Sequence, residues 1–345
     1  MAQRTTVINW VSLWPSHLAL RQAHHPRTPR ILMSTYVDPL IFRELQDSEV
    51  LPAPSGVRLR IMQMCQQEDI ALPDLVAQIQ GDPVLAGRLI QIANIPNLNK
   101  GRMVASVNVD LLLMVGLQAV RQMALAISLT ESARRGDCAE FDYDAFWSRS
   151  TAMACASQAL ADLIPVAPPA EMFTIGLLAD IGRLALASAR PKRYGEILRG
   201  VGTDAPAAAL RQEEKQAFSF DHLELAAAMM QDWLFPKLFC ETVLHHEAAD
   251  STGLDEEDRQ QRLIRLLELA ACVADICVAD DATRAALLPH LLQLGERFEL
   301  PSSSLEYLCA RVSWDWSEWG AMLKIPTRVL RELGSALAAA TEQPG

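Results

Sequence analysis

The sequence lacks the long uncharged apolar run that a membrane-spanning helix requires. Its most apolar stretch, residues 111–129, is interrupted by Arg121 and Gln122, whereas a span needs about 20 predominantly apolar residues. A basic excess is also missing, because 31 Lys and Arg stand against 42 Asp and Glu and give a net charge of −11 with His neutral. A chain of this charge lacks the broad positive surface that binds DNA or RNA. We therefore expect neither a membrane nor a nucleic acid as a partner.

Cysteine pairs and the common catalytic motifs are missing as well. None of the 7 cysteines lies in a Cys-x-x-Cys pair, and Cys272 and Cys277 have the wrong spacing for a zinc or thioredoxin-type site. We interpret the cysteines as small apolar residues on helix faces, in a reducing compartment. The N-terminus has no compact apolar segment before a cleavage site, which predicts cytoplasmic localisation. The absence of a GxSxG elbow, a P-loop and a dinucleotide-binding fingerprint argues against three large enzyme classes.

The residues that are present favour helices around an apolar core. Half of them are hydrophobic, and from Val50 onward Ala, Leu, Gln, Glu and Arg dominate, with little alternation of β-branched residues. We therefore predict an all-α fold. Asp82 followed by Pro83 predicts a helix start, and residues 111–129 predict one long helix or a helix pair, with Gly116 permitting close packing. Further helices are expected around residues 143–163, 170–188, 192–200, 205–216, 221–233, 236–247 and 261–279.

Residues 1–32 differ from the rest of the chain. They contain scattered arginines together with Pro26 and Pro29, without a sustained helical period, which predicts a flexible segment. Met33 offers an alternative start of translation, which would place this segment upstream of the true start. A basic contact with a nucleic acid or a partner is the other interpretation that the arginines leave open.

Short motifs follow one another in a characteristic order between residues 48 and 282. They are Leu-Pro-Ala-Pro (51–54), Asp82 to Leu85, Ala93-Asn94, Val115 to Leu117, Phe146 to Ser150, Gly176 to Leu184, His222, Trp233 with Pro236, and Val243 to Glu247. This series resembles the HDOD family, the HD-related output domains of bacterial signalling proteins. The resemblance implies a multi-helix bundle in which an HD-like helical core is preceded by a smaller helical subdomain. We accordingly divide the chain into an N-terminal extension (1–45), an HDOD domain (46–285, with subdomains 46–135 and 136–285) and a C-terminal helical extension (286–345).

The resemblance also implies the remnant of a metal site. HD phosphohydrolases hold divalent metals with a first histidine, a His-Asp pair and a later aspartate. Here Arg149 aligns with the first histidine, and Ala179 takes the place of the histidine in the His-Asp pair. Asp180 remains, and Asp275 is the candidate for the last aspartate. Arginine is permanently protonated and alanine has no ligand atom, so we predict no catalytic residue, no bound metal and no cofactor.

An ion pair between Arg149 and Asp180 would replace the metal by an internal cation. Three histidines, His222, His245 and His246, also stand at positions of this degenerate site. One interpretation is a weak metal or ligand site that they form with Asp180. The other is structural: one histidine packs in the bundle with a hydrogen bond, and its neighbour, about 100° round the helix, faces solvent.

Without chemistry, the function must lie in binding, and a polar loop is one candidate surface. It carries Asn94, Asn97, Lys100 and Arg102, which could contact a partner or an anion, or belong to an ordinary connection. The former metal pocket is a second candidate, because the Arg149 guanidinium could bind a phosphate-bearing ligand.

A third candidate surface lies near the C-terminus. Trp314, Trp316 and Trp319 form either a recognition patch or a helix face that docks onto its own bundle. Trp316, Trp319 and Leu323 share one helical face at i, i+3 and i+7, the spacing of a docked helix.

These observations predict a non-catalytic output or adaptor protein. The resemblance implies that it acts through protein–protein interaction in a bacterial regulatory pathway, one linked to cyclic dinucleotides. Its partner would be an unidentified signalling protein, with a small nucleotide as a further ligand. The alternatives are a residual metal-dependent phosphohydrolase of the HD superfamily and a non-catalytic nucleotide-binding sensor.

Overall fold

A computed structural model describes residues 36–328, apart from residues 49, 54–55, 66, 68, 95–103, 203–205 and 234. Within these described ranges all regular secondary structure is helical, which confirms the predicted all-α class. Residues 1–33 and 329–345 lie outside the described residues, so the predictions made for those segments remain predictions. The domain boundaries proposed from the sequence likewise remain predictions.

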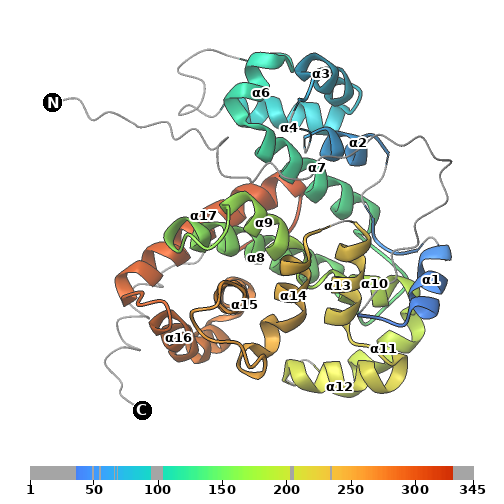
Figure 1. The fold of residues 1–345 in the computed structure, drawn as a ribbon, viewed down its shortest axis with the longest axis vertical. Coiled ribbons are helices and arrows are strands. Elements are labelled where there is room, and N and C mark those ends of the chain that lie inside the picture. Colours follow the sequence, from blue (N-terminus) through green and yellow to red (C-terminus); the bar gives the residue numbers. More distant parts are fainter. Residues whose placement is uncertain are drawn as a thin grey trace. The chain divides into compact units, whose positions relative to one another are not determined.

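The first group of helices gathers around α7 (Figure 1). Its members are α2 (Gly56–Met64), α3 (Leu72–Gln80), α4 (Pro83–Ala93), α6 (Val109–Val115) and α7 (Leu117–Ser132). The helix before them, α1 (Pro39–Asp47), packs instead beside helices that come later in the chain. Just before α1, Tyr36 Oη donates a hydrogen bond of 3.0 Å to Glu241. The start of the described chain is therefore held by a segment about 200 residues further along.

The predicted start of α4 is confirmed in atomic detail. The Asp82 carboxylate accepts hydrogen bonds of 3.1 Å from the backbone N–H groups of Val84 and Leu85, and Pro83 occupies the first helical turn. These bonds satisfy amides that otherwise have no partner within the helix. Arg58 Nε also binds Asp82 at 2.6 Å, so the same carboxylate ties α2 to α4.

The apolar stretch 111–129 forms a helix pair, one of the two predicted outcomes. Helices α6 and α7 meet at Gly116 with a bend of 88°. Gly116 has a φ of +88°, a backbone region that favours glycine, and no atom lies within 4 Å of a Cβ built there. The prediction that Gly116 permits close packing is therefore wrong, because the glycine is needed for the turn.

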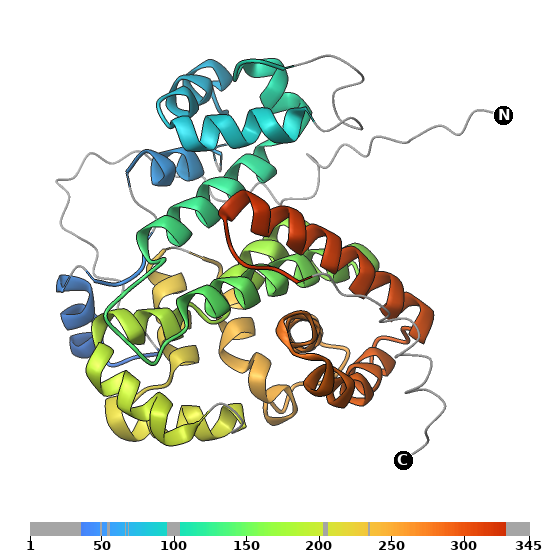
Figure 2. The same ribbon diagram turned by 180° about the vertical axis from the view of Figure 1, so that it is seen from behind.

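The second group of helices surrounds α8 (Figures 1 and 2). Its members are α8 (Tyr143–Leu163), α9 (Pro169–Leu178), α10 (Ile181–Ala189), α11 (Pro191–Val201), α12 (Ala207–Phe218), α13 (His222–Asp232), α14 (Lys237–His245), the 3-10 helix η2 (His246–Ser251), α15 (Arg259–Val278), α16 (Asp281–Glu296) and α17 (Ser302–Leu323). Helices α9, α15 and α17 pack most extensively on α8, and α13 packs on α10. The single helix predicted around 170–188 is in fact α9 and α10, which meet at residues 179 and 180.

A glycine allows the close approach of α10 and α13. A Cβ at Gly182 would lie 1.9 Å from the carbonyl oxygen of His222, which is far inside van der Waals contact. Because Gly182 follows the junction of α9 and α10 and His222 begins α13, this contact brings two parts of the predicted site together.

Within the part of the chain that the structure describes, one helical stretch, residues 169–189, is long and apolar enough to cross a membrane, and the bent pair α6–α7 passes the same test only if it is taken as one span. The most apolar part of residues 169–189 is 83% buried inside the fold, as in the core of a globular domain.

The cysteines agree with their interpretation as apolar residues, since six are buried and Cys65 is half-buried, and all are free thiols.

Candidate functional site

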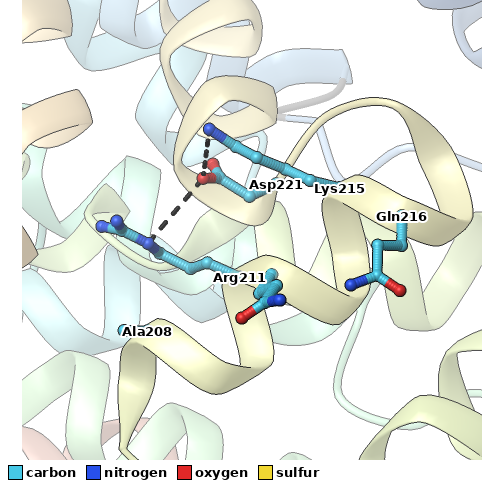
Figure 3. Close-up of a pocket in the computed structure, with 6 residues that line it drawn as sticks. Ala208, Arg211, Lys215, Gln216 and Asp221 are labelled. Carbon is cyan, nitrogen blue, oxygen red and sulfur yellow. Dashed lines mark ion pairs between the residues drawn. The ribbon is translucent and has the colours of Figure 1, made fainter.

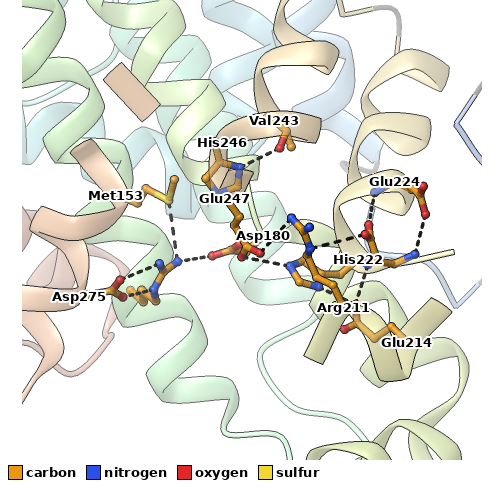
Figure 4. Close-up of polar contacts among 12 residues, drawn as sticks. Met153, Asp180, Arg211, Glu214, His222, Glu224, Val243, His246, Glu247 and Asp275 are labelled. Carbon is orange, nitrogen blue, oxygen red and sulfur yellow. Dashed lines mark hydrogen bonds and ion pairs between the residues drawn. The ribbon is translucent and has the colours of Figure 1, made fainter. Parts of the chain in front are cut away.

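The centre of the predicted site is a guanidinium held between two carboxylates (Figure 4). Arg149 lies on α8, Asp180 lies at the junction of α9 and α10, and Asp275 lies on α15. Arg149 Nη1 forms an ion pair with Asp180 Oδ2. On its other side Arg149 binds Asp275 with both arms of a fork, Nε to Oδ1 at 2.6 Å and Nη2 to Oδ2 at 3.3 Å. The ion pair expected between Arg149 and Asp180 is thus present, and Asp275 extends it.

Burial and charge act against each other in this cluster. Asp180 is 4% exposed, and burial by itself favours the neutral acid, but the neighbouring Arg149 cation outweighs burial and holds the pKa of Asp180 below its usual range. Burial likewise disfavours the Arg149 cation, while Asp275 and Asp180 raise its pKa. Arg149 and Asp180 are therefore both charged at neutral pH.

This arrangement does not fit the metal position of an HD phosphohydrolase. Ala179 is fully buried and offers no ligand atom where a histidine is expected. Arg149 cannot donate a lone pair to a metal, and it occupies both Asp180 and Asp275. Its Nε, Nη1 and Nη2 each bind a carboxylate, so the guanidinium has no free fork for a phosphate-bearing ligand either.

His222 belongs to a second buried network beside this cluster. Its Nδ1 lies 2.7 Å from Glu214 Oε2, and its Nε2 lies 3.4 Å from Glu247 Oε1. Glu214 is completely buried and also accepts hydrogen bonds from the His222 backbone N–H at 2.9 Å and from Tyr194 Oη at 3.2 Å. Burial disfavours the imidazolium, but Glu214 and then Glu247 outweigh it and raise the pKa of His222 to about 10. His222 is thus a charged group between two carboxylates.

The raised pKa of His222 makes stability depend on pH. The folded chain holds a proton on His222 up to about pH 10, whereas the unfolded chain releases it near the ordinary value of 6.5. The stabilisation that the protonated His222 contributes is fully present below pH 6.5. As the pH rises above this value, the free energy of unfolding falls by at most about 1.4 kcal/mol per pH unit. We expect urea denaturation to show this decline between about pH 6.5 and pH 8.5, before unfolded thiols ionise. A His222→Gln variant should lose the slope, whereas a His245→Gln variant should keep it; equal slopes in all three proteins would contradict the assignment.

The adjacent histidines His245 and His246 have different surroundings. The His245 side chain is 36% exposed and lies 3.5 Å from Glu241 on its own helix. His246 is 1% exposed, and its Nδ1 lies 2.8 Å from the carbonyl oxygen of Val243. The structural interpretation thus describes the pair correctly, since one packs in the bundle and its neighbour reaches solvent.

Three of the remaining groups could hold a metal ion. Ligand atoms of Asp180, His246 and Glu247 all lie within 4.8 Å of one another. His246 Nε2 and Glu247 Oε2 are buried and have no hydrogen-bond partner. Of the histidines predicted at the site, only His246 is in this group, because His222 turns to Glu214 and His245 lies away from it.

A surface pocket of about 410 Å³ lies beside the second network (Figure 3). Arg211 and Lys215 line it from α12, and both face Asp221, with Nε and Nζ lying 3.8 and 3.2 Å from Asp221 Oδ2. Arg211 Nη1 also lies 3.7 Å from Glu247 Oε2. The pocket therefore reaches the buried network through one half-buried arginine.

The polar loop predicted as an interaction surface is described only at its base. Asn97, Lys100 and Arg102 lie outside the described residues. The Asn94 side chain closes the base of this loop, because it accepts a hydrogen bond from the Val104 N–H at 2.8 Å and donates one to the Val104 carbonyl at 2.7 Å. Asn94 thus has a structural role, as the alternative of an ordinary connection implies.

The three tryptophans of α17 are placed differently. Trp316 is completely buried, and its Nε1 donates a hydrogen bond of 2.9 Å to the carbonyl of Ser148 on α8. Trp319 packs on Phe173, with ring centroids 4.7 Å apart. Trp314 is 69% exposed. The docked-helix interpretation is therefore right for Trp316 and agrees with the packing of the half-buried Trp319, whereas Trp314 is the most exposed of the three.

Sequence reasoning missed Glu214 and Glu247 as members of the site. Glu247 had a signal, because it directly follows the two histidines. Glu214 had none, since it stands in a polar segment, residues 211–216, whose side chains look alike in sequence. Its complete burial becomes visible only when α12 packs beside α13.

Several known proteins are similar to this chain in sequence or in fold. A family model for the HDOD domain matches residues 51–249. The MmoQ response regulator of Methylococcus capsulatus is 38% identical over 74% of this chain and 95% of that chain, with a TM-score of 0.47. A proposed phosphohydrolase of Shewanella amazonensis is 20% identical over 88% and 98% of the two chains, with a TM-score of 0.58. A proposed signal transduction protein of Marinobacter aquaeolei is 18% identical over 85% and 67%, with a TM-score of 0.56.

No curated protein matches the chain. The likeness to the last two structures concerns the fold, which is also helical here. The family model spans more than half of the chain and includes Arg149, Ala179, Asp180, His222 and His246. The chain therefore belongs to the HDOD family.

Proposed function

We propose that this chain is a non-catalytic signalling output or adaptor protein that acts in the cytoplasm through protein–protein contacts. Membership of the HDOD family supports a signalling role. The names of two relatives, a response regulator and a proposed signal transduction protein, point in the same direction. The observation that carries the proposal is the Arg149 guanidinium, which binds Asp180 and Asp275 together.

The physical reason lies in what metal-dependent hydrolysis needs. A divalent ion must be held by lone pairs while it acidifies a water and binds phosphate oxygens. At the HD position one expected ligand is a permanent cation and another is a methyl group, and the two carboxylates are bound by that cation. A metal there would have to displace a buried ion pair, which costs several kcal/mol.

Turnover assays with the full-length chain test this proposal. We expect no hydrolysis of cyclic di-GMP or of nucleoside phosphates in Mn²⁺, Mg²⁺ or Fe²⁺, because two expected ligands are missing at the HD position and Arg149 already binds its two carboxylates. Turnover that disappears in an Asp180→Ala variant would overturn the proposal. Turnover that persists in that variant would instead identify a contaminating enzyme.

A second candidate function is a residual phosphohydrolase. The free donor atoms of His246 and Glu247 beside Asp180 favour it, and the same assay decides between the two. A nucleotide sensor without catalysis is separated from both by calorimetric titration of the chain with cyclic di-GMP, since it binds the nucleotide and leaves it intact.

One accessible aromatic face is compatible with a partner. Tyr307 and Trp314, seven residues apart on α17, are 63% and 69% exposed. Two turns of a helix place such residues on the same side, and exposed aromatic residues are enriched where proteins bind each other. An unidentified signalling protein remains the proposed partner.

A further inference from the structure

We propose that Asp180, His246 and Glu247 form a divalent metal-ion site beside the position that Arg149 fills in the degenerate HD site. The site shares Asp180 with that position and uses neither Asp275 nor the residues at 149 and 179. It does not rest on the proposed function, because a metal can bind to a protein that catalyses nothing.

His246 has the geometry of a ligating histidine. A carbonyl oxygen only accepts hydrogen bonds, so Nδ1, at 2.8 Å from the oxygen of Val243, carries the proton and donates it. In the neutral ring Nε2 then carries the lone pair, and this atom is buried without a partner. Metal-binding histidines are typically oriented in this way, with the second nitrogen fixed by a carbonyl or a carboxylate.

Glu247 supplies the second buried donor atom for a metal that has no hydrogen-bond partner. Its Oε1 faces His222 at 3.4 Å, whereas its Oε2 is buried and accepts no hydrogen bond. Arg211 Nη1 lies 3.7 Å from Oε2, close enough for attraction but beyond a hydrogen bond. Asp180 adds a third donor, since Arg149 contacts it through Oδ2 only.

The three donors define the class of ion. One imidazole nitrogen and two carboxylate oxygens within 4.8 Å suit Mn²⁺, Fe²⁺ or Zn²⁺, with water completing the coordination. The buried lone pair of His246 and the free oxygen of Glu247 would then be satisfied, as buried polar atoms usually are. Arg149, Arg211 and the protonated His222 surround the site and weaken its affinity by repulsion.

Metal binding by the full-length chain tests the proposal directly. The protein is stripped with a chelator and titrated with Mn²⁺, and free Mn²⁺ is followed by electron paramagnetic resonance and binding heat by calorimetry. We expect about one ion per chain, with affinity reduced at least about tenfold in the His246→Gln and Glu247→Gln variants. A His245→Gln variant, altered one residue away on the exposed side, should bind like the wild type.

An Arg211→Gln variant gives a test that does not depend on altering a ligand. It removes a cation that lies 3.7 Å from Glu247 Oε2 on a half-buried side chain, so Mn²⁺ affinity should rise several-fold. Absence of stoichiometric uptake by the wild type, or equal affinity in wild type and His246→Gln, would overturn the proposal. So would an Arg211→Gln variant that folds normally, as judged by circular dichroism, and binds Mn²⁺ more weakly. None of these readouts involves turnover, so they are independent of the assay for the proposed function.

Discussion

Replacing Arg149 with methionine is expected to lower the free energy of unfolding by about 3–5 kcal/mol. The change removes the one cation that binds both Asp180 and Asp275 and leaves the Asp180 carboxylate, 4% exposed, without its ion-pair partner. Most of the loss should come from Asp180, because Asp275 is 41% exposed and water can solvate it. Urea denaturation followed by circular dichroism measures the difference.

Two further variants separate the ion pair from general damage. Adding Asp180→Leu to Arg149→Met removes both buried charges, and stability should return to near the wild-type value, since apolar replacement of a buried pair is often neutral or stabilising. Arg193→Met is the matched control, because Arg193 forms an exposed pair with Glu196 on one helix; its loss should stay below about 1 kcal/mol. A loss below about 1 kcal/mol in Arg149→Met itself would show that Asp180 needs no internal cation.

Replacing Trp316 with alanine is the second change with a large expected effect. The indole is completely buried between α17 and α8, and its N–H donates to the Ser148 carbonyl. Its removal leaves a cavity and loses this additional hydrogen bond, so the free energy of unfolding should fall by about 3–5 kcal/mol. Thermal unfolding of the full chain gives the measurement.

Trp314 provides the control for this prediction. It lies two residues away on the same helix but is 69% exposed, so Trp314→Ala should change stability by less than about 0.5 kcal/mol. Similar losses in the two variants would contradict the placement of α17. The pair of variants also separates folding from recognition, since Trp316 is completely buried and Trp314 is the most exposed of the three tryptophans.

Local features of the fold could be predicted because their causes are local. Asp82 and Pro83 start α4 through bonds to residues two and three positions ahead, and such caps act within one turn of helix. The bend at residue 116 was harder to predict from the sequence, since a glycine in an apolar run is compatible both with close helix packing and with a turn. A positive φ with no neighbour within 4 Å decides for the turn.

The candidate site likewise combines features that the sequence could predict with features that only the packing of the helices decides. The HDOD resemblance places two metal ligands of HD phosphohydrolases at residues 149 and 179, and residue chemistry then predicts their loss, because arginine and alanine cannot bind a metal in any fold. The partners of His222 could not be predicted in this way. Glu214 lies on α12 and Glu247 at the start of η2, 8 and 25 residues away, and only helix packing brings both to one imidazole.

The sequence by itself determined the helical class and the acidic charge, since these depend on composition and short-range caps, and with the HDOD resemblance it also predicted the loss of the HD ligands. Tertiary structure decided which of His245 and His246 is buried, which tryptophan is exposed and where the free donors of Asp180, His246 and Glu247 meet. The physical reason is rotation about the helix axis. Neighbouring residues differ by about 100° around a helix, so the packing of each helix fixes which side chain points inward.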